Sequence, residues 1–450
     1  MKLLPPVEPH VLYKEGFGEA DLLQRREAGT RLSRLLEDLD DPVVVALDGR
    51  WGSGKSYFLR RWVGAHTVEN GGKATVVYFD AFANDYLEEP LIALTAAIGE
   101  RLPRNDKRVS WRKAKHLAFK LAMPAFRLGL ATVTAGVSEA GGAVIAAAAE
   151  AGSSDIEAAA DAFWKREEGR QAAMAAFGKC LSNLTVGEEE SEPKRLIIVV
   201  DELDRCRPDY ALGLLEVVKH FFQVPHVHFV LGTNLEALEH SVRARYGATV
   251  DASDYLKRFI TVTMALPNQV GSYGHEVAAL VYFDRCAERM GLQGALPAEV
   301  RDQLEMKNVR SILTLRDVEN LLSRMVLFPN RRNFHAIPEG FRCAAATLLL
   351  MQTLRPDLFT RALTGLLTPS DVHSFLGIDR KILQDKSKCS SQTDVNANFI
   401  GNFWSGVLDP DNQSEETIAQ ISRLIGRPGQ DGAFVANVLR RYFGLFELNL

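Results

Sequence analysis

Short apolar runs rich in β-branched residues recur through the first 270 residues and alternate with segments of helical periodicity. The runs are continuous rather than alternating, which is typical of parallel strands with both faces covered. We expect strands at 43–48, 75–82, 196–202, 227–234 and 259–266. Helical patterns lie before and between them, at 22–39, 57–66, 91–102 and 211–222. This alternation predicts an open α/β sheet.

The pattern changes after about residue 270. Strand signals fade, and apolar residues recur at helical spacing in segments such as 275–290, 315–328, 341–354 and 431–443. This spacing predicts a helical domain. We therefore expect an α/β domain over 1–270 and a helical C-terminal domain over 271–450.

A glycine-rich loop follows the first predicted strand directly. The sequence GRWGSGKS at 49–56 satisfies G-x-x-x-x-G-K-[ST], and a helical pattern begins immediately after it. Backbone amides of such a loop surround a phosphate at the N-terminus of the helix. We expect Lys55 to bind the β and γ phosphates and Ser56 to place its hydroxyl on Mg²⁺. The expected nucleotide-binding residues are Gly49, Arg50, Trp51, Gly52, Ser53, Gly54, Lys55, Ser56 and Tyr57.

The third predicted strand ends in acidic residues, in the sequence LIIVVDELD. A magnesium ion that keeps most of its waters needs a fixed carboxylate to hold them. Asp201 is placed for that role. Glu202 could act as the general base that polarises the attacking water, and Asp204 is a second candidate for the base.

The fourth predicted strand ends at Asn234, whose amide could hydrogen-bond the γ phosphate or the attacking water. A turn-forming asparagine is the alternative interpretation. The stretch that follows, TNLEAL, lacks the lysine and the aspartate of the N-K-x-D guanine-binding motif. We therefore expect ATP rather than GTP as the nucleotide.

Hydrolysis also needs a cation at the γ phosphate, supplied by the same chain or by a neighbouring one. Arg258, just before the fifth strand, and Arg316, in the helical half, are the preferred candidates. The full candidate set is Arg205, Arg243, Arg245, Arg258 and Arg316.

Together these motifs resemble the KAP family of P-loop NTPases. The matching pieces are LDGRWGSGKSYFL (47–59), FDAFANDYLEEPLIAL (79–94), VVDELDRC (199–206), YLKRFI (255–260) and LRDVENLL (315–322). Where the family more often has two aspartates, this chain has Asp201 and Glu202, which leaves the base open between Glu202 and Asp204. The resemblance implies an extra strand between the P-loop strand and the acidic strand, and a Mg²⁺-dependent ATPase or ATP-driven switch. It also implies an insertion that often carries membrane spans, and roles in prokaryotic defence.

The interval between the second and third strands is far longer than one crossover helix requires, so we expect a helical insertion at about 103–190. Its apolar part, 117–152, is rich in alanine and glycine. Lys55 and Asp201 must meet at one nucleotide, so a chain that entered a membrane between them would have to return. Two spans need about 40 apolar residues and a turn. The segment is shorter than that and contains Glu139, so we expect no membrane span.

Two other interpretations of the insertion stay open beside a helical pair packed on the protein or on a partner. The basic stretch and the apolar segment, 101–152, could lie on an anionic membrane surface. Alternatively, the basic patch around Trp111 could bind nucleic acid. The net charge of −4 makes nucleic acid an unlikely partner for the chain as a whole.

Composition places the chain among ordinary globular proteins. The five cysteines are scattered and form no C-x-x-C pair, which argues against a disulfide framework or a structural zinc site and indicates a reducing cytoplasm. The N-terminal residues lack the apolar core of a signal peptide. We expect a cytoplasmic protein, with peripheral attachment to the inner face of the membrane as the alternative.

The function that these observations predict is Mg²⁺-dependent ATP hydrolysis coupled to a conformational or assembly switch. A scaffold that binds ATP with little turnover is the alternative. We expect a protein partner at the helical half, and a homo-oligomer is compatible with the sequence.

Overall fold

The computed structural model describes most of both predicted domains. The described residues are 3–5, 10–18, 21–87, 90–101, 175, 178–179, 181–185, 194–221, 224–270, 276–328, 331–379, 381, 383, 389–425 and 434–443.

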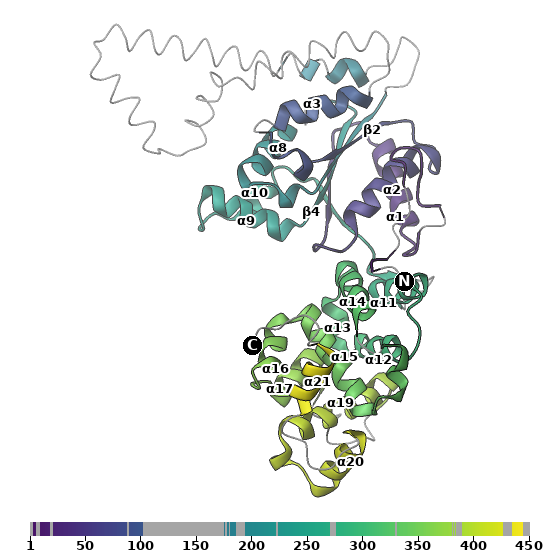
Figure 1. The fold of residues 1–450 in the computed structure, drawn as a ribbon. Helices are drawn as coiled ribbons and strands as arrows, with labels where there is room; N and C mark the ends of the chain where they lie inside the picture. Colours follow the sequence, from purple (N-terminus) through teal and green to yellow (C-terminus); the bar gives the residue numbers. More distant parts are fainter. Residues whose placement is uncertain are drawn as a thin grey trace, which may run out of the picture.

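Among the described residues, five parallel strands form the central sheet, in the order β2-β3-β4-β1-β5 (Figure 1). Their bounds are Val44–Asp48 for β1, Thr75–Asp80 for β2, Leu196–Asp201 for β3, Val227–Thr233 for β4 and Val262–Ala265 for β5. Each observed strand lies within its predicted range, so the prediction of a parallel α/β sheet is confirmed. Strand β4 lies between β1 and β3, which is the extra strand that the family resemblance implied.

Helices cover both faces of the sheet (Figure 1). One face carries α1 (Arg26–Asp38) and α2 (Lys55–Val68), and Trp62 of α2 is buried against Val45 and Val199. The other face carries α3 (Pro90–Arg101), α8 (Pro208–Phe221), α9 (Leu235–Tyr246) and α10 (Ala252–Leu256). Short 3₁₀ turns follow β2 at Phe82–Asn84 and β3 at Leu203–Arg205. Because the strands are parallel, the loops after β1, β3 and β4 meet at one edge of the sheet.

The second half of the chain is helical, which confirms the predicted C-terminal helical domain. It follows a short antiparallel ribbon of β6 (Gln269–Val270) and β7 (Glu276–Val277). Its helices are α11 (Ala278–Met290), α12 (Ala295–Leu304), α13 (Lys307–Ile312), α14 (Leu315–Leu327), α15 (Glu339–Leu354), α16 (Pro356–Leu363), α17 (Pro369–Leu376), α19 (Gln392–Leu408), α20 (Glu415–Ile425) and α21 (Phe434–Tyr442), with 3₁₀ turns at Arg331–Ala336 and Pro410–Asn412. The division at residue 270 stays a prediction.

A buried polar network fixes the packing of three of these helices. The Thr347 hydroxyl of α15 donates to Oε1 of Gln303 in α12 at 2.8 Å, and Trp404 Nε1 of α19 donates to the same hydroxyl at 3.1 Å. Nε2 of Gln303 donates to the Cys343 carbonyl at 3.1 Å. Because a buried polar group without a partner is costly, these bonds favour one register of α12, α15 and α19.

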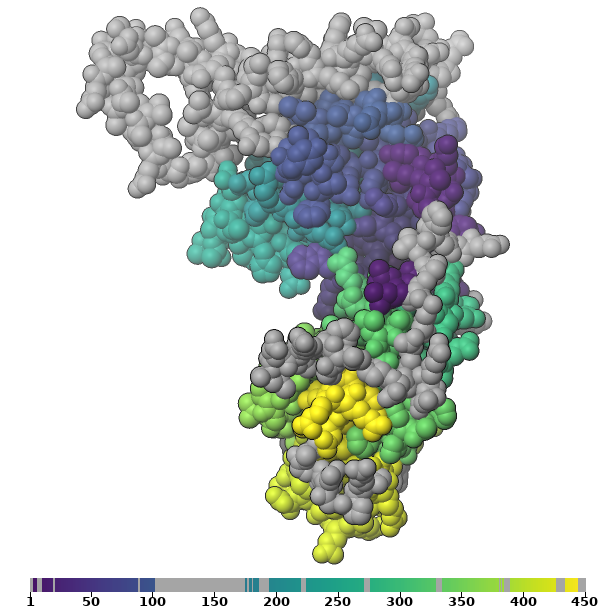
Figure 2. Space-filling model, in the orientation of Figure 1, coloured from purple at the N-terminus to yellow at the C-terminus, as the bar shows by residue number. Residues whose placement is uncertain are grey.

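The sheet domain and the helical domain meet over a narrow region. Figure 2 shows them as two masses, with purple N-terminal atoms beside green atoms of the helical domain where they meet. Helices α11 and α14 are the helical-domain elements nearest to the sheet domain (Figure 1). The nucleotide-binding motif therefore lies close to a domain interface.

Within the described ranges, no helix combines the length and the apolar character that are needed to cross a bilayer. The apolar segment at 117–152 lies outside the described residues, as does nearly all of the predicted insertion at 103–190. The interpretations of that segment therefore stay predictions.

A substitution at Leu321 tests how the core of the helical domain is packed. The Leu321 side chain on α14 is fully buried, whereas Leu327 at the end of the same helix is 43% exposed. We expect Leu321→Ala to lower the free energy of unfolding by about 2–5 kcal/mol, because it leaves a cavity, and Leu327→Ala to lower it by less than about 1 kcal/mol. Urea denaturation followed by circular dichroism measures both, and equal losses would contradict this packing.

Candidate functional site

The P-loop joins β1 to α2 and wraps around the Lys55 side chain. Lys55 is the first residue of α2 and is only 8% exposed. Its Nζ donates to the carbonyls of Gly49 and Arg50, the second at 3.2 Å. Burial lowers the pKa of Lys55, with carboxylates nearby acting in the opposite direction. Beside it, the Ser53 hydroxyl is buried without a hydrogen-bond partner in the described part of the chain. A phosphate would supply partners to both groups.

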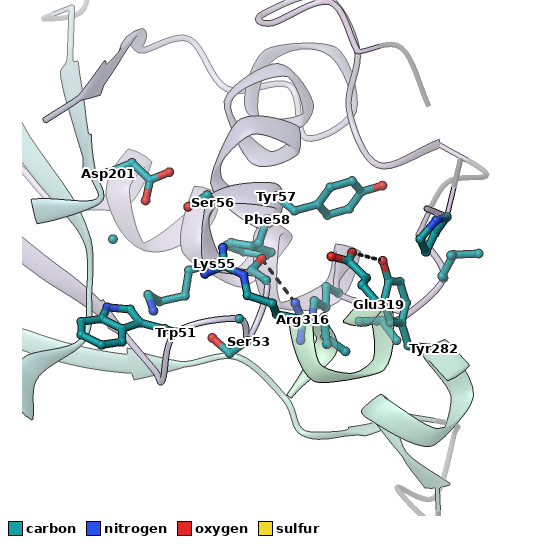
Figure 3. Close-up of a pocket in the computed structure, with 18 of the residues that line it drawn as sticks. Trp51, Ser53, Lys55, Ser56, Tyr57, Phe58, Asp201, Tyr282, Arg316 and Glu319 are labelled. Atoms are coloured by element: carbon teal, nitrogen blue, oxygen red, sulfur yellow. Dashed lines mark hydrogen bonds between the residues drawn. The ribbon is translucent and has the colours of Figure 1, made fainter. Parts of the chain in front are cut away.

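A cavity of about 290 Å³ opens beside this loop, between the sheet domain and the helical domain. Lys55, Ser56 and Asp201 lie toward one side of it, and Tyr282 and Glu319 lie on the other (Figure 3). The predicted site residues that line the cavity are Trp51, Gly52, Ser53, Gly54, Lys55, Ser56, Tyr57, Asp201, Glu202, Asp204, Arg205 and Arg316.

Asp201 lies at the carboxyl end of β3 and is 1% exposed. Its Oδ2 accepts a hydrogen bond from the Tyr78 hydroxyl at 2.7 Å, and its Oδ1 accepts one from the Glu202 amide at 2.9 Å. Burial raises the pKa of Asp201 to about 6. A Cβ atom at Gly232 would lie 2.5 Å from Oδ1 of Asp201, so glycine on β4 is what lets the carboxylate fit between the strands.

Glu202 and Asp204 have different contacts. Glu202 has a left-handed backbone, with φ of 58°, and its Oε1 accepts from the Ser56 hydroxyl at 3.3 Å and pairs with Arg205 at 3.1 Å. Asp204 instead accepts the indole N–H of Trp51. That bond ties the P-loop to the loop after β3.

The oxygen atoms at this end of the cavity fit Mg²⁺. Magnesium is held in such sites by one or two protein oxygens together with waters and phosphate. The Ser56 hydroxyl and the Asp201 carboxylate would supply oxygen ligands for the metal. Both groups contact Glu202, so they lie at the same end of the cavity. Among the described residues there is no cluster of three or more histidine, cysteine or acidic side chains that could hold a metal without phosphate and water as further ligands.

The helical domain is hydrogen-bonded directly to the P-loop. The backbone amides of Leu315 and Arg316, at the N-terminus of α14, donate to the Gly52 carbonyl at 3.0 and 3.3 Å. Thr314 before them and Asp317 after them form a capping box. The first amides of a helix have no partner within it, so the Gly52 carbonyl satisfies two of them. This contact places Arg316 at the cavity.

Comparison with known proteins identifies the family of this chain. The family model described as "KAP family P-loop domain" matches residues 26–330. The chain belongs to this family. The match spans the P-loop, the acidic strand and the whole of α14.

Two solved structures are similar to this chain, both of the Aeropyrum pernix ORC2 protein. The one with ADPNP and ADP is 12% identical, covers 92% of this chain and 99% of its own, and has a TM-score of 0.34. The ADP form is 14% identical, covers 90% and 97%, and has a TM-score of 0.30. Such low TM-scores support no conclusion about fold or function. No match was found among the curated proteins.

The other predicted residues of this KAP domain lie outside the cavity lining. Gly49 and Arg50 contribute carbonyls to Lys55, as described above. The Asn234 side-chain oxygen accepts a hydrogen bond from the Ala237 amide at 3.5 Å and caps α9. That oxygen is thus used within its own turn, as in the turn-forming interpretation. Arg258 is exposed and lies 5.7 Å from the centre of the Tyr255 ring. Arg243 and Arg245 form surface ion pairs with Glu239 and Asp209.

Arg25 is a cavity residue that the sequence analysis missed. It is 5% exposed, its Nη1 donates to the Gly54 carbonyl at 3.4 Å, and its Nε is buried without a partner among the described residues. Burial lowers the pKa of Arg25 to about 10. Phe17, Tyr282 and Glu319 also line the cavity. They come from an N-terminal segment, α11 and α14, and no local sequence signal connects those segments with a P-loop.

A substitution at Gly52 tests the contact between the P-loop and the helical domain. The φ of Gly52 is 80°, and a Cβ atom there would lie 2.7 Å from Cβ of Arg316, whereas Gly71, with φ of 67°, has no atom within 4 Å of such a Cβ. Both alanine variants suffer left-handed strain of about 1–2 kcal/mol. We expect Gly52→Ala to lose at least about 1 kcal/mol more in urea denaturation than Gly71→Ala, since it also overpacks the interface. Equal losses would contradict the contact.

The raised pKa of Asp201 sets a pH dependence in the absence of Mg²⁺. An acid whose pKa is higher in the folded state than in the unfolded state stabilises the fold most when it is protonated. For Asp201 this stabilisation is complete below pH 3.8 and is lost as the pH rises through about 6. The loss amounts to at most about 3 kcal/mol, at about 1.4 kcal/mol per pH unit. Between pH 4 and pH 7.5, in EDTA, the stability of wild type should therefore fall relative to that of Asp201→Asn. Urea denaturation of both at several pH values measures this, and a constant difference would refute it.

Proposed function

We propose that this KAP family protein is a Mg²⁺-dependent ATPase whose turnover drives a conformational or assembly switch. One observation carries the proposal. A single cavity brings the P-loop lysine, the Ser56 hydroxyl and two acidic residues from β3 and its exit together, with Ser56 Oγ 3.3 Å from Oε1 of Glu202. These are the group types that position nucleotide, metal and attacking water in phosphoryl transfer.

Each residue has a defined task in this mechanism. The P-loop amides and Lys55 bind the β and γ phosphates and offset their charge. Ser56 and Asp201 would hold Mg²⁺, which neutralises charge that develops on the phosphate oxygens. Glu202 takes a proton from the water that attacks the γ phosphate in line. Arg316, carried to the cavity by α14, stabilises the charge of the transition state.

Contacts favour Glu202 over Asp204 as the base. Asp204 already accepts the Trp51 indole N–H and is 9% exposed, so its carboxylate holds the P-loop in place. Glu202 contacts Ser56 directly. If the Ser56 hydroxyl bound Mg²⁺ instead, Glu202 would lose this contact and its carboxylate would be free to turn toward the γ phosphate.

A second candidate is a nucleotide-gated scaffold that binds ATP with little turnover. The ion pair between Arg205 and Glu202, at 3.1 Å, favours it. A base held in an ion pair with an arginine is not free to approach the water. In that case a partner that breaks the pair would switch hydrolysis on.

Each of the two domains would make its own contact with a partner. The helical domain would bind a protein partner and report the nucleotide state through α14. Exposed Arg258 would reach the nucleotide of a neighbouring copy in a homo-oligomer. Contact of 101–152 with a membrane surface and a role in prokaryotic defence remain proposals of the same kind, and residues 102–152 lie outside the described residues.

Three variants and a control test the proposed function. Lys55→Ala should weaken binding of a fluorescent ATP analogue at least about tenfold, because it removes a buried charge from the phosphate site. Glu202→Gln should bind the analogue normally but release phosphate about 10²–10⁴ times more slowly. Asp204→Asn should lower the rate by about tenfold or less. Lys257→Ala, an exposed lysine paired with Asp254, should change nothing.

The same measurements decide between the two candidates. If wild type retains ATP but releases no phosphate, the scaffold replaces the enzyme. Tight nucleotide binding by Lys55→Ala would contradict both. A larger loss of rate in Asp204→Asn than in Glu202→Gln would assign the base to Asp204.

A further inference from the structure

Tyr78 lies beside the carboxylate proposed to hold the metal. Strands β2 and β3 pair in register, with Tyr78 opposite Val199 and Asp80 opposite Asp201. Tyr78 and Asp201 are therefore diagonal neighbours on one face of the sheet, within reach of a long side chain. The Tyr78 hydroxyl donates to Oδ2 of Asp201 at 2.7 Å.

The direction of that hydrogen bond is fixed by Arg60. Nε of Arg60 on α2 donates to the Tyr78 oxygen at 3.3 Å, and its guanidinium lies 5.5 Å from the centre of the Tyr78 ring. Since an arginine can only donate, the Tyr78 oxygen accepts from Arg60 and its proton points to Asp201. The Tyr78 amide donates to the Tyr13 hydroxyl at 3.0 Å, which holds the strand at this position.

Asp201 depends on few other groups for its orientation. It forms no ion pair with any described residue, and its other oxygen accepts the Glu202 amide. The Ser56 hydroxyl is a third hydrogen-bond partner of this carboxylate. A carboxylate has about four lone-pair sites, so one remains for a water of a metal shell, and a second would become available if the Ser56 hydroxyl bound the metal. The tyrosine and the Glu202 amide together fix the plane of the carboxylate.

We propose that Tyr78 is a positioning residue, which orients Asp201 toward the water shell of the Mg²⁺ that accompanies the nucleotide. Arg60 supports it from behind. This inference rests on the proposed function, because it concerns the metal of the same site. Groups that orient a metal-binding side chain typically contribute a factor of about 10–100 in metal affinity or activity.

The experiment compares nucleotide binding with and without Mg²⁺. Trp51 is 51% exposed at the cavity and can transfer excitation energy to an N-methylanthraniloyl ATP analogue. In EDTA, Tyr78→Phe should bind the analogue like wild type, because no phosphate contact changes. The Mg²⁺ concentration that gives half-maximal tightening should rise about tenfold or more.

Two further variants keep the result specific. Tyr210→Phe removes another buried hydroxyl, one with no hydrogen-bond partner in the described chain, and should leave the Mg²⁺ midpoint unchanged. Arg60→Gln should shift the midpoint in the same direction as Tyr78→Phe but by less. If Tyr78→Phe is unstable, the Arg60→Gln result decides, since Arg60 is exposed.

The outcomes separate the inference from the function on which it rests. A normal Mg²⁺ midpoint in Tyr78→Phe, with Mg²⁺-dependent binding intact in wild type, overturns the role of Tyr78 and leaves the proposed function standing. Weaker binding of Tyr78→Phe in EDTA as well as in Mg²⁺ overturns it too, because the effect would then be structural. No Mg²⁺ dependence in wild type overturns the proposed function itself.

Discussion

The hydrogen bonds from the N-terminus of α14 to the Gly52 carbonyl connect the two halves of this protein. The Gly52 carbonyl of the P-loop accepts hydrogen bonds from the Leu315 and Arg316 amides at 3.0 and 3.3 Å. Arg316 lies so close to Gly52 that there is no room for a side chain at that position. The cavity exists because of this contact, since its far wall is made by α11 and α14. Any movement of the P-loop on phosphate binding acts directly on the helical domain.

The acidic end of β3 shows how one short segment supports several tasks. Asp201 is buried between Tyr78 and Gly232, at a cost that is reflected in its raised pKa. Glu202, with its left-handed backbone, reaches Ser56, and Asp204 anchors the P-loop through Trp51. A buried carboxylate without a cation destabilises the protein, and a metal would recover that free energy on binding. Stability and nucleotide binding would then be coupled at this strand end.

The sequence predicted the strands, their parallel arrangement and the P-loop well, because continuous β-branched runs and a glycine pattern are local signals. Glu202 and Asp204 could not be separated from sequence, since their difference lies in contacts with Ser56 and Trp51 on other elements. Arg25 was missed for the same reason. Its partner, the Gly54 carbonyl, is 29 residues away, and the cavity that Arg25 lines is shared with residues of α11 and α14. Asn234 kept two interpretations because a helix cap and a phosphate contact use the same residue type.

The central claim is that one nucleotide site is shared by the P-loop and the N-terminus of α14. Hydrogen–deuterium exchange, with and without a non-hydrolysable ATP analogue and Mg²⁺, tests it most directly. We expect the analogue to slow exchange together in two segments that are far apart in the sequence, 49–57 and 315–319. The exchange rates in α19, in the helical core, should stay the same. Slower exchange confined to 49–57, with 315–319 unaffected, would contradict a shared site.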